Sequence, residues 1–275
     1  MGDSLTTSDY NYENQEEITP QSAVIFRFMY VAVYSITIFL GILLNTIVIF
    51  MAKKDKFQSG KTLILSLAVT HLVFCLFLPF NLISAWQEFT WKFGDEACKL
   101  VSYVRIVNMF SVSMMITFWK MDWCCSKSYE KHMVLLSWVI GVILSIPSLL
   151  YREVQDTADG KVCLDKYDTT EDLLRMTAVM CCRLIFGLLL PLVVTCFNCF
   201  KKNNKKSVVV TLVISVHFLC WAPVLCLSVL QVKLSTYNSL ITQVLPLATA
   251  LSVLNSCISP IIFFWKGMKK DPRRC

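Results

Sequence analysis

Seven long stretches of the chain are almost entirely apolar, and short polar segments separate them. We predict helices at 23–52, 61–86, 97–125, 132–151, 177–201, 206–231 and 238–265. An apolar helix of about 20 residues spans a bilayer's hydrocarbon core of roughly 30 Å. A helix on the surface of a soluble protein would carry a polar face, and these stretches carry almost none. The pattern therefore predicts an all-α fold, a bundle of seven transmembrane helices.

Three regions follow from this pattern. Residues 1–22 form an acidic tail, residues 23–265 form the helical membrane domain, and residues 266–275 form a short basic tail. The first tail lacks a basic start followed by an apolar core, so we do not expect a cleaved signal peptide. The longest connector, 152–176, is strongly charged, and the others are short.

The charges of the connectors predict the orientation in the membrane. If the N-terminus is extracellular, the cytoplasmic segments hold sixteen Lys and Arg against four Asp and Glu, and the rest of the chain holds ten against fifteen. The positive-inside rule favours this arrangement, with the C-terminus in the cytoplasm. We expect the basic rim to lie against anionic lipid of the inner leaflet. The net charge of +7 therefore gives no reason to expect nucleic acid as a partner.

Three other classes of protein fit the sequence poorly. Thirteen Cys accompany only three His, and no pair of Cys-x-x-Cys motifs is present, so we expect neither a metal nor a cofactor. No nucleophile–base pair stands out, which argues against an enzyme. Inverted repeats and interrupted helices, which mark many transporters, are not visible either.

Motifs within the helices carry more information than the helix count. They are GILLN, SLAVTH, WKFGDEACK, FLCWAP and LPLATALSVLNSCISPIIF, in chain order. Together they resemble the class A, or rhodopsin-like, G-protein-coupled receptors over nearly the whole chain. Within that class, the WxFG…CK turn, PLATAL and NSC are similar to the chemoattractant group of formyl-peptide, anaphylatoxin and chemerin receptors, with the chemerin receptors most similar. The resemblance implies a multi-pass plasma-membrane receptor for a peptide or small protein, acting in chemotaxis and inflammatory signalling.

The resemblance also implies a disulfide on the extracellular side. Cys98 opens the third predicted helix, and Cys163 lies in the long connector. Both are expected to face an oxidising compartment, where disulfides persist. In the family this bridge holds the connector over the ligand.

Two arginines inside the predicted bundle are candidates for ligand binding. Arg105 lies about two turns from Cys98, and Arg183 lies about two turns before Pro191. Charges within a membrane are costly and often functional. Arg183 occupies the position where the resemblance implies a carboxylate-binding arginine, and a guanidinium fork suits that role. The alternatives are snorkelling or an internal ion pair.

The acidic tail is a second candidate for ligand capture. Tyr10 and Tyr12 lie among acidic residues, and such a tail attracts basic ligands over long range. Tyrosine sulfation would add to this attraction. The alternative is an unstructured, solvated tail.

The cytoplasmic end of the third helix departs from the family pattern. The family carries an Asp-Arg-Tyr-like triplet there, and this chain has Asp122 followed by Trp123. An indole offers neither the charge nor the five donors of a guanidinium. This change argues against efficient coupling to a heterotrimeric G protein.

The last two helices retain part of the family's activation switch. Trp221 and Pro223 stand in the CWAP motif, as the family has them. Pro260 is also present, but Phe263 replaces the tyrosine that the family carries after it. We expect helix kinks at four prolines, which are Pro147, Pro191, Pro223 and Pro260.

The region that holds sodium in the family is altered too. His71 replaces the family's central aspartate, and an imidazole is a poor ligand for a hard cation. We expect a buried neutral histidine with a hydrogen-bond partner, and ligand affinity that is insensitive to sodium. Val112 and Ser259 also differ from the family pattern, whereas Asn108 and Asn255 keep polar character nearby.

Two functional hypotheses remain open at this point. One is a signalling receptor for a peptide chemoattractant. The other is an atypical or decoy receptor of the same ancestry, which binds its ligand without activating a G protein because the activation motifs are altered.

Overall fold

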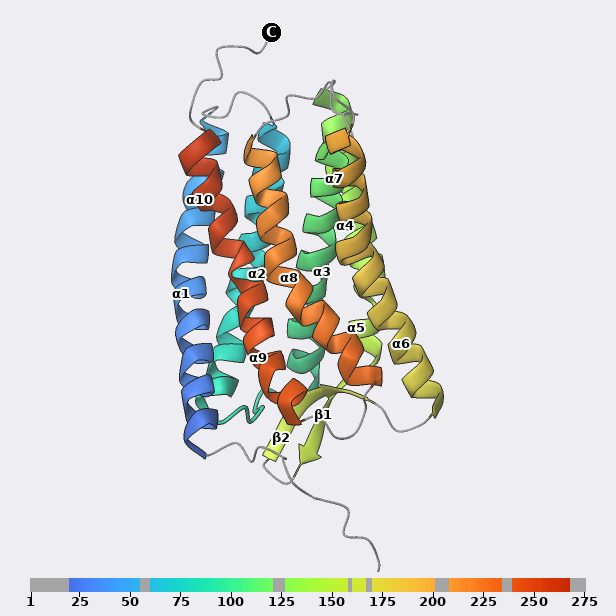
Figure 1. Ribbon diagram of the computed structural model, residues 1–275. Coiled ribbons are helices and arrows are strands. Elements are labelled where there is room, and N and C mark those ends of the chain that lie inside the picture. The colour runs from blue at the N-terminus through green and yellow to red at the C-terminus, as the bar shows by residue number, and fades with distance from the viewer. Residues whose placement is uncertain are drawn as a thin grey trace, which may run out of the picture.

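A computed structural model describes residues 20–54, 60–120, 127–157, 160–166, 170–200, 208–233 and 239–267. Within these residues, seven helical spans are long and apolar enough to cross a membrane, and they are Val24–Lys53, Lys61–Trp86, Gly94–Trp119, Tyr129–Leu150, Glu171–Phe197, Thr211–Leu230 and Val244–Phe264. They run side by side as one bundle (Figure 1). The predicted all-α bundle of seven transmembrane helices is confirmed.

Four of the seven spans are single helices, namely α1 (Pro20–Lys53), α2 (Lys61–Trp86), α3 (Gly94–Lys120) and α8 (Val208–Lys233). The other three are divided. They consist of α4 (Lys127–Ser145) with α5 (Pro147–Leu150), α6 (Thr170–Leu184) with the π-helix η1 (Ile185–Leu189) and α7 (Leu190–Phe200), and α9 (Ser239–Val253) with α10 (Asn255–Gly267).

The divisions follow the predicted proline positions only in part. Pro147 begins α5, and η1 lies just before Pro191. The last span is divided at Leu254, several residues before Pro260. In contrast, α8 continues through Pro223 without a break. A proline alone therefore does not determine where a helix is divided, because neighbouring helices can satisfy the carbonyl that proline leaves without a donor.

The connector 152–176 contains structure that the sequence reading missed. Strands β1 (Arg152–Thr157) and β2 (Gly160–Asp165) form an antiparallel hairpin, with Arg152 opposite Asp165. The fifth span begins already at Thr170, rather than at 177. The hairpin lies across one end of the bundle, the end at which α1 and α9 begin (Figure 1). We call this end the hairpin end.

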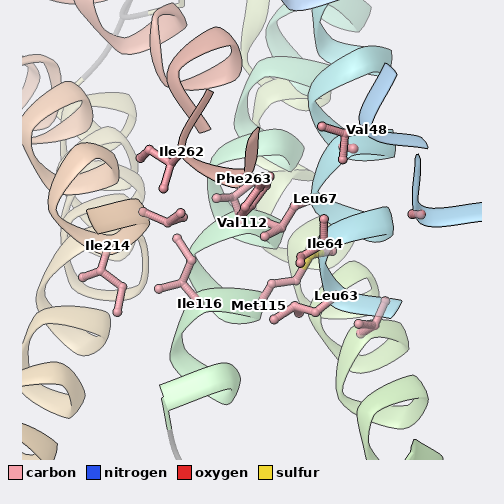
Figure 2. Close-up of a cluster of buried hydrophobic side chains, with 14 residues drawn as sticks. Val48, Leu63, Ile64, Leu67, Val112, Met115, Ile116, Ile214, Ile262 and Phe263 are labelled. Atoms are coloured by element: carbon pink, nitrogen blue, oxygen red, sulfur yellow. The ribbon is translucent and has the colours of Figure 1, made fainter. Parts of the chain in front are cut away.

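The largest apolar core cluster lies toward the opposite end. It joins six helices, α1, α2, α3, α4, α8 and α10, through fourteen buried side chains (Figure 2). A side chain from α4 supports the same region, because Glu130 Oε1 accepts a hydrogen bond of 3.0 Å from the Leu63 backbone N–H. A carboxylate at a helix N-terminus stabilises the first turn, which in α2 has no side-chain cap of its own.

The outward faces of the bundle are also apolar. Phe39, Phe197 and Leu219 are each about two-thirds or more exposed. A protein with large apolar side chains exposed over its whole surface would aggregate in water, whereas such a surface is well solvated by the hydrocarbon of a bilayer. Burial and exposure therefore agree with the hydropathy pattern.

Candidate functional site

The hairpin is attached to α3 and to the segment before it. The Cys98–Cys163 disulfide links α3 to β2, which confirms the expected bridge. Asp95 Oδ1 accepts a 2.6 Å hydrogen bond from the Val154 N–H of β1. The backbone N–H of Trp91 donates a hydrogen bond to the backbone carbonyl of Lys161 at 2.6 Å. Covalent and backbone contacts to both strands thus fix the hairpin over the bundle.

Arg152 and Asp165 form an ion pair at the base of the hairpin. Arg152 Nη1 lies 3.0 Å from Asp165 Oδ2, and both side chains are largely buried. Arg152 Nε also donates to Ser102 Oγ of α3 at 2.9 Å. The Asp165 charge is therefore already engaged with a cation of the hairpin itself.

The structure places Arg183 in a contact between the fourth and fifth spans. Its side chain on α6 is buried, with the residue 8% exposed. Nη2 donates to Ser148 Oγ of α5 at 3.0 Å, and Nη1 lies 3.6 Å from Met180 Sδ. Arg183 is thus partly engaged by the protein before any ligand arrives.

Arg105 on α3 has a different environment. It is half-buried, and it makes no hydrogen bond or ion pair with the residues that the structure describes. The charged and titratable groups that act on it are Arg152, Asp165, Tyr30 and Tyr34. Because Asp165 already pairs with Arg152, the charge of Arg105 is left uncompensated among these neighbours. An uncompensated cation at this depth favours an anionic ligand group.

Two tyrosines of α1 lie within electrostatic range of Arg105. Tyr30 and Tyr34 stack with ring centroids 4.2 Å apart, and Phe89 meets Tyr30 edge-on at 5.4 Å. The sequence reading did not single out these tyrosines. Each tyrosine stands in an apolar stretch of the sequence, where an aromatic residue commonly serves only for packing. Their position near the arginine becomes visible only when the helices are assembled.

Deeper in the bundle, Trp221 of α8 is buried, with 2% exposure. Its ring centroid lies 6.4 Å from that of His217, one turn earlier on the same helix. Among the described residues, its indole N–H has no hydrogen-bond partner. Pro223, two residues further on, is half-buried.

A side chain of α1 satisfies a carbonyl in the last span. Pro260 has no N–H, so the carbonyl four residues earlier, that of Ser256, lacks its helical donor. Asn45 Nδ2 donates to this carbonyl at 2.8 Å, and also to the Gly41 carbonyl at 2.8 Å. The buried amide therefore joins α1 to α10 at the point where proline would otherwise leave an unpaired acceptor.

The altered sodium region forms two separate polar pairs. Asn108 Nδ2 lies 3.4 Å from His71 Nδ1, and both side chains are buried. Ser259 Oγ donates to Asn255 Oδ1 at 3.5 Å on α10. His71 therefore has the buried position and the hydrogen-bond partner that the sequence predicted.

Comparison with known proteins identifies the family. A family model described as the 7 transmembrane receptor (rhodopsin family) matches residues 43–263, most of the chain. The chain belongs to the rhodopsin family of seven-transmembrane receptors. This membership confirms the predicted class A receptor, a multi-pass protein of the plasma membrane and not an enzyme.

Receptors of the chemoattractant group are similar over nearly the full chain. Human chemerin-like receptor 1 is 31% identical over 297 residues, which cover 92% of this chain and 78% of that protein. Rat chemerin-like receptor 2 is 28% identical over 268 residues, covering 87% and 76%. The C3a anaphylatoxin chemotactic receptor of Oncorhynchus mykiss is 25% identical over 287 residues, covering 94% and 79%.

Val112 and Phe263, two positions at which the resemblance implied a hydroxyl group, lie in one apolar cluster. Both are buried, with 1% exposure, in the cluster that also holds Leu67 (Figure 2). An unpartnered hydroxyl would be costly among these apolar side chains, and neither valine nor phenylalanine brings one.

Four of the receptor's predicted site residues lie outside the described part of the chain. They are Tyr10 and Tyr12 in the acidic tail, and Asp122 and Trp123 after α3. Two further polar residues, Ser113 and His217, were missed by the sequence reading and prove to lie in buried contacts. The available signal was a histidine within an otherwise apolar run, which is costly in a membrane without a partner.

Proposed function

We propose that this receptor binds a peptide or small protein chemoattractant at its hairpin end, with Arg105 and Arg183 receiving acidic groups of the ligand. The uncompensated charge of Arg105, beside the stacked rings of Tyr30 and Tyr34, carries the proposal. Similarity to proteins named as chemerin-like and C3a anaphylatoxin receptors supports the ligand class and a role in chemotaxis.

The two arginines have different parts in this proposal. Arg105 is ready to take an anion, whereas Arg183 must exchange or share its contact with Ser148. A carboxylate offers two acceptors, so it can share the guanidinium with the protein groups that already contact it. The acidic tail with Tyr10 and Tyr12 would attract the basic part of the same ligand before it reaches the bundle.

A decoy receptor is the second candidate for the function. Trp123, which stands in place of the arginine expected from the resemblance, favours the decoy receptor. Val112 and Phe263 favour it too, because they put apolar side chains of the buried cluster where the resemblance implies hydroxyl groups. Binding would then occur without efficient activation of a heterotrimeric G protein. The two candidates share the hairpin end and differ at the other end of the bundle.

One cell-based experiment tests both candidates. Labelled recombinant human chemerin is bound to cells that express the receptor, and G-protein activation is recorded in the same cells. Binding with activation supports the signalling receptor, and binding without activation supports the decoy. If chemerin and C3a both fail to bind to receptor that is present at the surface, the proposed ligand class is wrong.

Arginine substitutions test the binding site itself. Arg105→Gln and Arg183→Gln should each weaken chemerin binding by about tenfold to a hundredfold, because each removes a charged hydrogen bond of about 1.5–3 kcal/mol. Arg175→Gln is the matched control, since Arg175 is exposed on α6 and pairs with Glu171 and Asp172. Unchanged affinity in both variants would remove the arginines from the site.

A further inference from the structure

The turn between α2 and α3 holds two residues in an unfavourable backbone conformation. Glu88 has a φ of 58° and Phe89 a φ of 63°, and no other residue except glycine has a positive φ in the described part of the chain. A residue with a Cβ rarely adopts this left-handed region, and a bulky one is an outlier there. Two such residues in succession mean that surrounding contacts hold the turn in a conformation that its own backbone disfavours.

Contacts with α1 hold the turn at its two strained residues. Arg27 Nη1 lies 2.5 Å from Glu88 Oε1, and the ring of Phe89 meets that of Tyr30 edge-on at 5.4 Å. The Glu88 side chain is 79% exposed, so its carboxylate can pass into water when the ion pair breaks. The Arg27 guanidinium then keeps its position over the Phe28 ring, 5.6 Å from the centroid. The ion pair can therefore open without leaving either charge stranded.

The backbone on either side of the strained residues is fixed. The Gln87 N–H donates to the Ile83 carbonyl of α2 at 3.1 Å, and the Trp91 N–H donates to the Lys161 carbonyl of β2 at 2.6 Å. Between these points, neither strained residue donates a backbone hydrogen bond to any residue that the structure describes. The turn thus has two anchored ends and a movable middle, which only side-chain contacts attach to α1.

We propose that residues 87–90 form a lid over Tyr30, which the ion pair between Arg27 and Glu88 keeps closed against the strain of its own backbone. Phe89 packs against the apolar cluster that contains Tyr30, and Tyr30 is only 7% exposed beneath it. An ion pair with an exposed partner contributes little to stability, whereas relief of strain favours opening. The lid is therefore closed by a small margin and opens when the ion pair is lost.

The lid lies above residues that the proposed function uses. Tyr30 stacks on Tyr34, and both tyrosines are within electrostatic range of Arg105. Opening of the lid would uncover the first of these rings from the hairpin end. Control of ligand entry toward Arg105 rests on the proposed function, whereas the lid itself rests on the turn and its contacts alone. Its tests therefore use the receptor without any ligand.

Amide hydrogen exchange of the full-length receptor in phosphatidylcholine nanodiscs tests the ion pair. Glu88→Gln and Arg27→Gln should each speed exchange in residues 87–91 by roughly twofold to fivefold, as expected for the loss of an exposed ion pair. The double variant Arg27→Glu with Glu88→Arg restores opposite charges and should recover part of the loss. Arg175→Gln breaks another exposed pair at the hairpin end and should leave residues 87–91 at the wild-type rate.

Glycine substitutions test the strain. Glu88→Gly and Glu88→Gln both remove the carboxylate, but glycine adopts a positive φ without penalty. Glu88→Gly should therefore exchange more slowly than Glu88→Gln, by roughly twofold to tenfold. Lys92 is an exposed residue of the same turn whose φ is not positive, so there the order should be reversed, with Lys92→Gly faster than Lys92→Gln.

Hydroxyl-radical labelling followed by mass spectrometry tests whether the turn covers Tyr30. Glu88→Gln should raise labelling of Tyr30 by roughly twofold to fivefold, in step with exchange, while Tyr103 of α3 serves as an internal reference and stays constant. Faster exchange with unchanged labelling of Tyr30 would show a mobile turn that is not a lid. Exchange in Glu88→Gly as fast as in Glu88→Gln, or a charge swap no slower than the single variants, would also overturn the proposal. Failure of chemerin to bind would contradict only the proposed function.

Discussion

At the scale of single residues, the two arginines of the hairpin end should affect stability in opposite directions. Arg105 is half-buried beside Arg152 and has no ion-pair partner in the described residues, so Arg105→Gln should raise the melting temperature of the unliganded receptor. Arg183 donates to Ser148, so Arg183→Gln should lower it. For a chain of this size, each kcal/mol corresponds to about 2–4 °C.

Thermal unfolding in nanodiscs measures both shifts, with Arg175→Gln as an exposed control. A fall in melting temperature for Arg105→Gln would mean that this guanidinium is engaged by the protein, and its role as a free anion receptor would then be lost. The sequence predicted both arginines at ligand depth, and the resemblance singled out Arg183, but it could not show which guanidinium the protein itself engages. The distinction depends on Ser148, which is 35 positions away and comes near only where the fourth and fifth spans meet.

At the scale of elements, a glycine determines how closely α3 and α4 pack. A Cβ at Gly141 would collide with Ser111 Oγ and would lie 3.1 Å from the Ser111 backbone nitrogen. Because the backbone cannot yield as a side-chain tip can, Gly141→Ala should destabilise the receptor by about 1–3 kcal/mol. Adding Ser111→Ala removes the closest atom and should restore part of the loss. A melting temperature equal to wild type in Gly141→Ala would contradict this packing.

Elements also show where prediction from the sequence ends. Seven apolar runs identified seven spans, since membrane length and hydropathy leave few alternatives. The hairpin in 152–165 was not predicted because its strands are short, charged and stabilised by contacts with Asp95, Trp91 and Cys98. The π-helix η1 was not predicted either. Within it, the Gly187 carbonyl accepts a hydrogen bond from Ser113 of another span, a contact that no local sequence pattern indicates.

At the scale of the whole molecule, the chain is asymmetric along the bundle axis. The hairpin end (Figure 1) carries the disulfide and the arginines, whereas the apolar cluster with Val112 and Phe263 (Figure 2) lies toward the opposite end. The proposed function requires the hairpin end to be extracellular, and the excess of cations in the opposite connectors predicts the same orientation. These are independent lines of reasoning, one from ligand chemistry and one from membrane insertion.

Glycosylation can therefore test the orientation on which both lines depend. The tail has no Asn-x-Ser/Thr sequence, and Glu13→Thr creates one at Asn11. Only an extracellular tail passes through the compartment where this asparagine is modified. The variant should thus migrate more slowly on a gel until a glycosidase restores wild-type mobility, while an epitope added after Cys275 should bind antibody only in permeabilised cells. An unmodified tail together with an epitope accessible on intact cells would place the hairpin end in the cytoplasm, where no circulating peptide could reach Arg105.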